Sequence, residues 1–283
     1  MSKVKIPVGL KGKELFKYLV DNKAYLVDAK KSDIKIADAL SVMPWRTQEH
    51  TEAEKGKFLY ENDENAGVLK RTIIANTYNW LDSHDDVHLN GIFAKSITEK
   101  GAKAPHLHDH LFELGAKVGQ PIGFSERDIS WRALGQSKTG MTQALFMESK
   151  VLKSYNAGIY DEYLNDQIDQ HSVRMRYINL ALAVNDSENY PVEYKVWQDT
   201  IARLGNRAQA EAQGYYWAVS EAALIEVSAV LLGANELTPT LGNKEQSLDD
   251  AETKEKVEPR KALDLTRAVR GFEKQLLTKT ILK

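Results

Sequence analysis

The stretch Asp166–Tyr177, DQIDQHSVRMRY, decides the predicted fold, because a helical pattern gives way there to a strand-like one. Residues 152–169 carry apolar side chains at helical spacing, and residues 173–184 have the pattern of a strand. The junction places Ser172 at the start of that strand. A serine hydroxyl is almost wholly protonated at neutral pH, so Ser172 is a nucleophile only if a base lies within hydrogen-bond reach and a third group orients that base.

The base for Ser172 must come from outside this stretch. His171 is adjacent, but successive side chains of a strand leave opposite faces, so His171 and Ser172 point apart. Three of the seven histidines, His106, His108 and His110, cluster further upstream. We expect the base to come from this cluster.

The same three histidines offer an alternative, a metal site. They alternate along the chain, so on a strand they share one face and suit an ion such as zinc. However, the three imidazoles spread along about 13 Å of strand and converge on one tetrahedral ion only if the strand bends. We therefore rank metal binding below the reading in which some of these histidines are simply solvated, and we predict no metal and no cofactor.

Composition limits the class of protein. The 283 residues are enough for one well-buried domain with appendages or for two small domains. The absence of cysteine excludes disulfides and thiol nucleophiles and suits a reducing compartment. The 38 basic and 40 acidic residues form no long block of one sign, which disfavours nucleic acid as a partner. Neither a signal peptide nor a run of about 18 apolar residues is visible, so we expect a soluble intracellular protein without a membrane partner.

Patterns along the chain indicate many short strands and few helices. Residues 118–123, where glycines flank a proline, are typical of a tight turn. The predicted strands are 68–79, 128–134, 141–149, 173–184 and 222–232, and the predicted helices lie near 12–22, 91–97, 152–169 and 196–212. This succession predicts an α+β fold whose core is a mixed, mostly antiparallel β-barrel with peripheral helices.

The predicted barrel occupies residues 66–241. Residues 1–65 are mostly polar and have the character of an N-terminal extension. Residues 242–283 are predicted to be a charged linker followed by a C-terminal amphipathic helix, since apolar residues recur there at spacings of four, three and four.

Glu226 is the second informative residue after Ser172. It stands in the most apolar stretch of the chain, AALIEVSAVLL, where a carboxylate is costly to bury unless it is paired. One interpretation is that Glu226 lies on a strand face that is open to water and that also carries Ser228. The other is that Glu226 orients a histidine, as the acid of a catalytic triad does. Residue chemistry alone does not favour either interpretation over the other.

Four short motifs occur in order along residues 68–239: NWLDSHDDVHLNGIFAKS at 79–96, HDH at 108–110 with QPIG at 120–123, HSV at 171–173, and IEVSAV at 225–230 with Ala234-Asn235. This order resembles the prohead (capsid maturation) proteases of tailed phages, a family similar in fold to the herpesvirus assemblins. Each motif is weak by itself, and the specificity lies in their succession.

The resemblance implies site residues. The family's serine falls on Ser172, its histidine on His108 and its acid on Glu226, with Glu221 and Glu193 as substitutes for the acid. His106 and His110 flank the assigned base and could compete with it. Arg174, two residues beyond Ser172 and on the same strand face, is a candidate side-chain donor to the oxyanion, for which backbone amides are the default.

The resemblance also implies a function: a serine endopeptidase that cleaves scaffold and major capsid protein segments, and itself, inside the assembling procapsid in the host cytoplasm. Both terminal segments are expected to be sites of self-cleavage or docking, and self-association is possible. A second hypothesis is a non-catalytic capsid assembly or scaffolding factor of the same fold. A third is a metal-assisted hydrolase that uses the histidine cluster.

Overall fold

The structure is a computed structural model that describes residues 6–7, 9–36, 63, 65–100 and 103–231. The chain divides into two compact units, residues 1–245 and 246–283, and all described residues belong to the first. The predicted linker and C-terminal helix at 242–283 lie outside the described residues, as does part of the predicted N-terminal extension.

Eight strands of the described residues form one mixed sheet. Seven lie in the order β1-β7-β8-β4-β5-β6-β2, and β3 pairs with β8 beside this path. Among the pairings of these described strands, only those of β8 with β3 and with β4 are parallel. The strands are β1 (Lys35–Ile36), β2 (Val68–Thr77), β3 (Asp86–His88), β4 (His106–His108), β5 (Lys117–Ser130), β6 (Met141–Leu152), β7 (His171–Val184) and β8 (Tyr215–Ala229).

The predicted α+β class and the mixed, mostly antiparallel sheet are therefore confirmed, whereas the predicted barrel is not supported. Within the described part of the chain, the sheet is open, with β1 at one end of the path and β2 at the other. A barrel closes only when its end strands pair. Here β1 is two residues long and pairs with β7.

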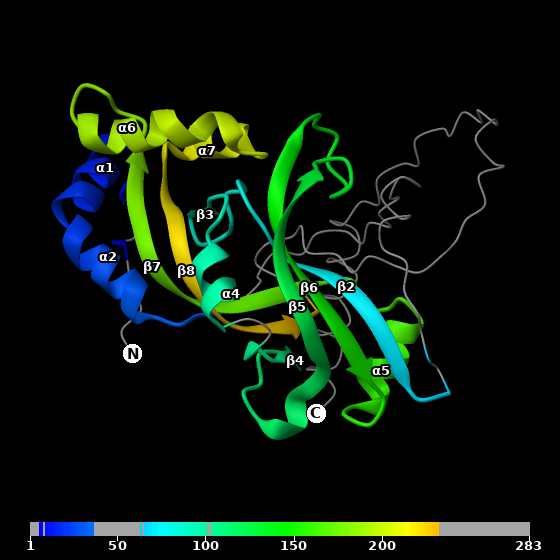
Figure 1. Cartoon of the computed structure of the whole chain (residues 1–283). Helices are drawn as coiled ribbons and strands as arrows, with labels where there is room; N and C mark the ends of the chain where they lie inside the picture. Colours follow the sequence, from blue (N-terminus) through cyan, green and yellow to red (C-terminus); the bar gives the residue numbers. More distant parts are fainter. Residues whose placement is uncertain (1–5, 8, 37–62, 64, 101–102, 232–283) are drawn as a thin grey trace, which may run out of the picture. The chain divides into compact units, whose positions relative to one another are not determined.

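The helices α1, α2, α6 and α7 lie beside the long β7–β8 pair (Figure 1). Leu19 and Leu26 from the first two helices are buried against Leu182 and Trp217, so these helices pack on the sheet. The described helices are α1 (Gly12–Asp21), α2 (Lys23–Ser32), α4 (Ala94–Lys100), α5 (Ala157–Leu164), α6 (Pro191–Thr200) and α7 (Arg207–Gln213), with 3₁₀ turns η2 (Leu114–Ala116) and η3 (Ile201–Arg203).

The connection from β7 to β8 carries α6, η3 and α7, where the sequence predicted a single helical run. Gly214 ends α7 with a φ of 80°, a left-handed conformation that suits glycine at a helix C-terminus. The chain then returns antiparallel to β7 along nearly the whole strand. This pairing brings the start of β7, which carries Ser172, beside the end of β8, which carries Glu226.

Among the described helices, none is long and apolar enough to cross a membrane.

Candidate active site

The register of β7 and β8 places four polar side chains on one face of the sheet. Ser172 lies opposite Ser228, and Arg174 lies opposite Glu226. Directly opposed residues of an antiparallel pair point to the same face, with Cβ atoms about 4.5–5.5 Å apart. Because side chains alternate along a strand, Val173 leaves the other face and joins the main hydrophobic core. The predicted serine and acid therefore share one face.

The histidine beside Glu226 is His110. Its Nδ1 atom lies 2.5 Å from Oε1 of Glu226, a side chain with no exposed surface. Ser228 Oγ donates to the other carboxylate oxygen at 2.7 Å. A carboxylate at Nδ1 favours the tautomer with the proton on that nitrogen, which leaves Nε2 of the neutral ring free to accept a proton.

His110 is held in an uncommon backbone conformation. Asp109 and His110 have φ values of 50° and 56°, in the left-handed region that non-glycine residues seldom adopt. The amide N–H of His110 donates to Ser228 Oγ at 3.1 Å, and Nη2 of Arg174 donates to the carbonyl of His110 at 2.5 Å. Consecutive residues of this kind are costly and persist where surrounding contacts fix them, which is common at active sites.

Three buried polar atoms at this site have no hydrogen-bond partner among the described residues: Ser172 Oγ, His110 Nε2 and Arg174 Nε. Arg174 Nε lies 3.5 Å from Oε1 of Glu226, an ion-pair distance but a weak hydrogen-bond one. A buried polar atom left unpaired costs about 1–3 kcal/mol, so an unpaired group in a native structure calls for an explanation.

His108, the base predicted from the sequence, lies elsewhere. The parallel pairing of β4 with β8 sets His108 opposite Ala229, whereas Ser172 is opposite Ser228, the neighbouring residue. His108 and Ser172 therefore leave opposite faces of the sheet. The Nδ1 atom of His108 contacts the Asp109 carboxylate at 3.0 Å. The structure therefore does not bring the side chain of His108 to Ser172.

The two substitutes for the acid are also placed away from His110. Glu221 accepts a hydrogen bond from Asn179 Nδ2 at 2.5 Å, and Glu193 accepts one from Lys23 Nζ at 2.5 Å. Of the three predicted acids, Glu226 is the one that contacts a histidine in the described part of the chain.

His106 and His171 form a separate buried group on the opposite face. His106 contacts Ser149 Oγ at 3.0 Å and the hydroxyl of Tyr163 at 3.1 Å, and that hydroxyl lies 2.8 Å from His171 Nε2. Burial, and then the nearby His171, hold the pKa of His106 well below its usual range. The clustered histidines thus have different partners, and no group of three or more possible metal ligands occurs among the described residues.

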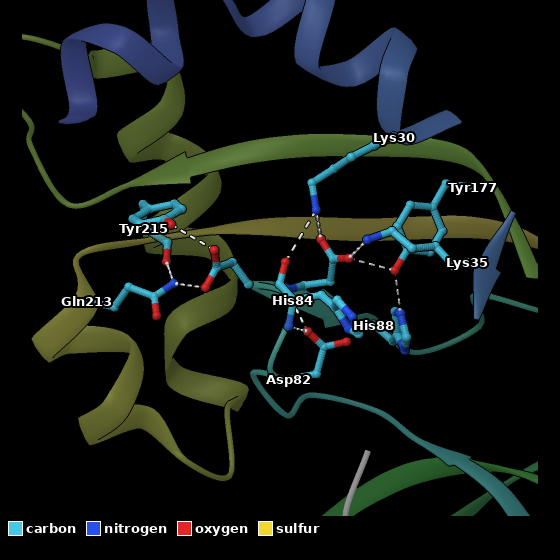
Figure 2. Close-up of polar contacts among 10 residues, drawn as sticks. Lys30, Lys35, Asp82, His84, His88, Tyr177, Gln213 and Tyr215 are labelled. Atoms are coloured by element: carbon cyan, nitrogen blue, oxygen red, sulfur yellow. Dashed lines mark hydrogen bonds and ion pairs between the residues drawn. The ribbon is translucent and has the colours of Figure 1, made fainter. Parts of the chain in front are cut away.

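A second polar cluster is centred on Asp86, which is 1% exposed, and Figure 2 shows the labelled side chains of Lys30, Lys35 and Tyr177 converging at this cluster. Its carboxylate contacts Lys30 through Oδ1, and through Oδ2 it contacts Lys35 at 2.9 Å and accepts a hydrogen bond from Tyr177 at 2.8 Å. Burial alone would raise the pKa of Asp86, but the two lysines outweigh it and hold that pKa below its ordinary value. Because Lys30 and Lys35 belong to α2 and β1, this cluster anchors the N-terminal segment on the sheet.

Two side chains extend the Asp86 cluster. His88 Nε2 lies 3.1 Å from the Tyr177 hydroxyl, and burial lowers the pKa of His88 to about 4. Asp82 accepts backbone hydrogen bonds from His84 and Asp86 at 2.8 and 2.9 Å. Burial, and then the Asp86 carboxylate, raise the pKa of Asp82 to about 7.

Sequence reasoning missed three of these roles. Ser228 was noted only as a residue that shares a face with Glu226, yet it bonds both Glu226 and the His110 backbone. Lys30 and Lys35 fell within the predicted extension. No local signal ties them to Asp86, which follows about 50 residues later in the chain.

The chain matches no protein-family model, and it shows no significant similarity to a curated protein or to a solved structure. The likeness to the prohead proteases therefore stays a prediction from the motifs.

Proposed function

We propose that this chain is a serine endopeptidase in which Ser172 is the nucleophile, His110 the base and Glu226 the acid that orients the base. One observation carries the proposal. His110 Nδ1 contacts the buried Glu226, while His110 Nε2 and Ser172 Oγ are buried polar atoms without a partner in the described part of the chain. A serine, an imidazole and a carboxylate are the parts of a hydrolytic triad, which is recognised by geometry and roles rather than by sequence position. The contact of the imidazole with the carboxylate is present here, but Ser172 Oγ makes no hydrogen bond to His110 Nε2, so the proposal requires the two atoms to approach each other when a substrate binds.

In the proposed mechanism, His110 Nε2 takes the proton of Ser172 Oγ as the oxygen attacks a peptide carbonyl carbon. Glu226 stabilises the imidazolium that forms, and Ser228 holds the second oxygen of Glu226. The proton then passes to the leaving amine, and water hydrolyses the acyl-enzyme. Arg174 already donates to the His110 carbonyl, so it acts as a positioning residue, and backbone amides are the expected oxyanion donors.

The substrates we propose are scaffold and major capsid protein segments, with self-cleavage, during procapsid maturation in the host cytoplasm. The support for this part is the order of the four motifs along the chain. The structure adds a requirement, since Ser172 is only 3% exposed. Local opening around Ser172 must precede the approach of a peptide bond.

The test is co-expression of the chain with the major capsid protein of the same source, followed by mass analysis of both. Wild type should yield shortened products, and Ser172→Ala should yield none. Ser154→Ala, at an exposed turn, is the matched control and should cleave like wild type. Cleavage that persists in Ser172→Ala would refute the assignment.

The burial of Ser172 favours one competing function, a capsid assembly factor that keeps the fold without catalysis. Such a protein gains nothing from access to Ser172. It predicts that a fluorophosphonate reagent labels no residue and that the Ser172→Ala variant supports assembly as wild type does. Labelling of Ser172 that requires His110 would exclude it.

A further inference from the structure

The loop that carries His110 exposes apolar side chains. In this loop, residues 109–114 and hereafter the His110 loop, Leu111 is 44% exposed, Phe112 66% and Leu114 83%. Single exposed apolar residues are common on protein surfaces, whereas contiguous ones mark binding surfaces. These side chains contribute little to the core at such exposure, so their apolar character calls for a different reason.

The backbone of the His110 loop is fixed although its side chains are exposed. The N–H of Asp109 donates to the carbonyl of Ala229 at 2.9 Å, and the N–H of Leu111 donates to that of His108 at 3.1 Å. Arg174 and Ser228 hold the backbone of His110 between them. The apolar side chains are therefore presented by an ordered segment, which reduces the entropy lost when a ligand binds.

Arg174 connects this apolar surface to Ser172. Its guanidinium lies over the ring of Phe112, 5.6 Å from the centroid, a cation–π contact. Ser172 and Arg174 are two residues apart on one face of β7, which separates them by roughly 7 Å along the strand. An extended peptide with its scissile bond at Ser172 thus carries the side chains of the next two or three residues, at about 3.3 Å each, towards Phe112.

The charge of the His110 loop indicates which kind of peptide would bind to it. Asp109, with a side chain 59% exposed, and Glu113, also exposed, give the His110 loop two acidic side chains, and the loop contains no lysine or arginine. Acidic groups at the edge of a binding surface favour basic groups on the partner.

Resting on the proposed function, we infer that Leu111, Phe112 and Leu114 form the substrate-binding surface for one class of peptide. That peptide is extended and carries a large apolar residue, flanked by lysine or arginine, within about three residues of the bond cleaved at Ser172. The occupant is a polypeptide substrate, and the contact selects it before the chemical step.

The test is digestion of a proteome-derived peptide library by the full-length protein, with cleavage sites read by mass spectrometry. Wild type should cleave beside large apolar residues with a basic neighbour. The variant Phe112→Ser/Leu114→Ser should lower kcat/KM for such peptides about tenfold, with little change for peptides that have alanine there. Val192→Ser, which removes an equally exposed apolar side chain from α6, is the control and should leave the preference unchanged.

The outcomes separate this inference from the proposed function. Ser172-dependent cleavage without apolar preference, or with a preference that the loop variant keeps, would overturn the inference and leave the protease intact. Absence of Ser172-dependent cleavage in wild type would overturn the protease and the inference with it. Equal unfolding midpoints for the three proteins exclude misfolding as a cause.

Discussion

The Asp86 cluster and the Ser172 site are both buried and both draw residues from the β7 strand, but they differ in how completely their groups are paired. Both oxygens of the Asp86 carboxylate are bonded, and its neighbours Tyr177 and His88 are bonded to one another. At the other site, Ser172 Oγ and His110 Nε2 have no partner in the described part of the chain.

We interpret this difference as one between a structural role for the Asp86 cluster and the proposed catalytic role of the Ser172 site. A saturated charge network has no atom left to offer a substrate, so we expect Asp86 to act on stability. The Ser172 site, in contrast, retains two unpaired polar atoms, Ser172 Oγ and His110 Nε2. They lie beside the left-handed backbone of Asp109 and His110. Unpaired polar atoms and backbone strain in one place cost stability and are retained where chemistry needs them.

The largest expected effect concerns the two histidines of the HDH motif. Replacing His110 by glutamine keeps a donor for Glu226 but removes the proton acceptor for Ser172, so kcat/KM should fall about 10⁴-fold. His108→Gln, the matched control on the opposite face, should stay within about threefold of wild type. Initial rates of cleavage of one substrate by the three proteins measure both effects.

Unfolding midpoints of the two histidine variants control for folding. An inactive His108→Gln protein beside an active His110→Gln protein would return the base to the position predicted from the sequence. It would also remove the contrast between the two buried clusters, because the unpaired Nε2 of His110 would then have no catalytic use.

The sequence predicted local elements better than their arrangement. The strand predicted at 68–79 is β2, because β-branched residues have a local preference for extended backbone. The tight turn predicted at 118–123 is instead part of β5, where the pairing with β6 shifts between Pro121 and Gly123. Glycine and proline mark both turns and bulges, so their spacing alone does not distinguish the two.

The candidate site shows the same limit. Alternation along strands indicated that Ser172 shares a face with Arg174 and that Glu226 shares one with Ser228, but only the pairing of β7 with β8 makes these the same face. The choice between His108 and His110 depends on the register of β4 with β8 and on the left-handed turn at Asp109, which are not local properties. Asp and His tolerate positive φ better than most residues, and this is the one signal that favours a turn at HDH over a continuous strand.

The next largest effect concerns the stability of the Asp86 cluster. Asp86→Asn leaves the ammonium groups of Lys30 and Lys35 buried without a countercharge, and we expect it to lower the free energy of unfolding by about 3–5 kcal/mol. Asp199→Asn, which breaks an exposed pair with Lys195, should cost less than about 0.5 kcal/mol. Urea unfolding at pH 7 measures both.

A double-mutant cycle sharpens the interpretation of Asp86. Lys30→Met in the Asp86→Asn background removes one uncompensated charge and should recover part of the lost stability. Coupling near zero between the two positions would mean that the cluster does not act as an ion-pair network, and its contrast with the Ser172 site would disappear.

The smallest effect is a pH dependence that belongs to Asp82. Its pKa in the folded protein, about 7, lies above the ordinary value of 3.8, so between these pH values the folded state binds more protons than the unfolded state. Stability conferred by Asp82 is therefore complete below pH 4 and lost as the pH rises to 7. Because Asp82 keeps some exposure, we expect a loss of about 2 kcal/mol, less than the full shift implies.

Asp82→Asn removes this loss while its amide oxygen still accepts from the backbone of His84 and Asp86. The free energy of unfolding of the variant, relative to wild type, should rise by about 2 kcal/mol from pH 4 to pH 8. His88, whose pKa is lowered to about 4, contributes the opposite slope in both proteins and cancels in the difference. Parallel stability curves for the two proteins would show that the pKa of Asp82 is the same in the folded and unfolded states, and the saturated cluster would then hold one more buried charge at pH 7 than we assign to it.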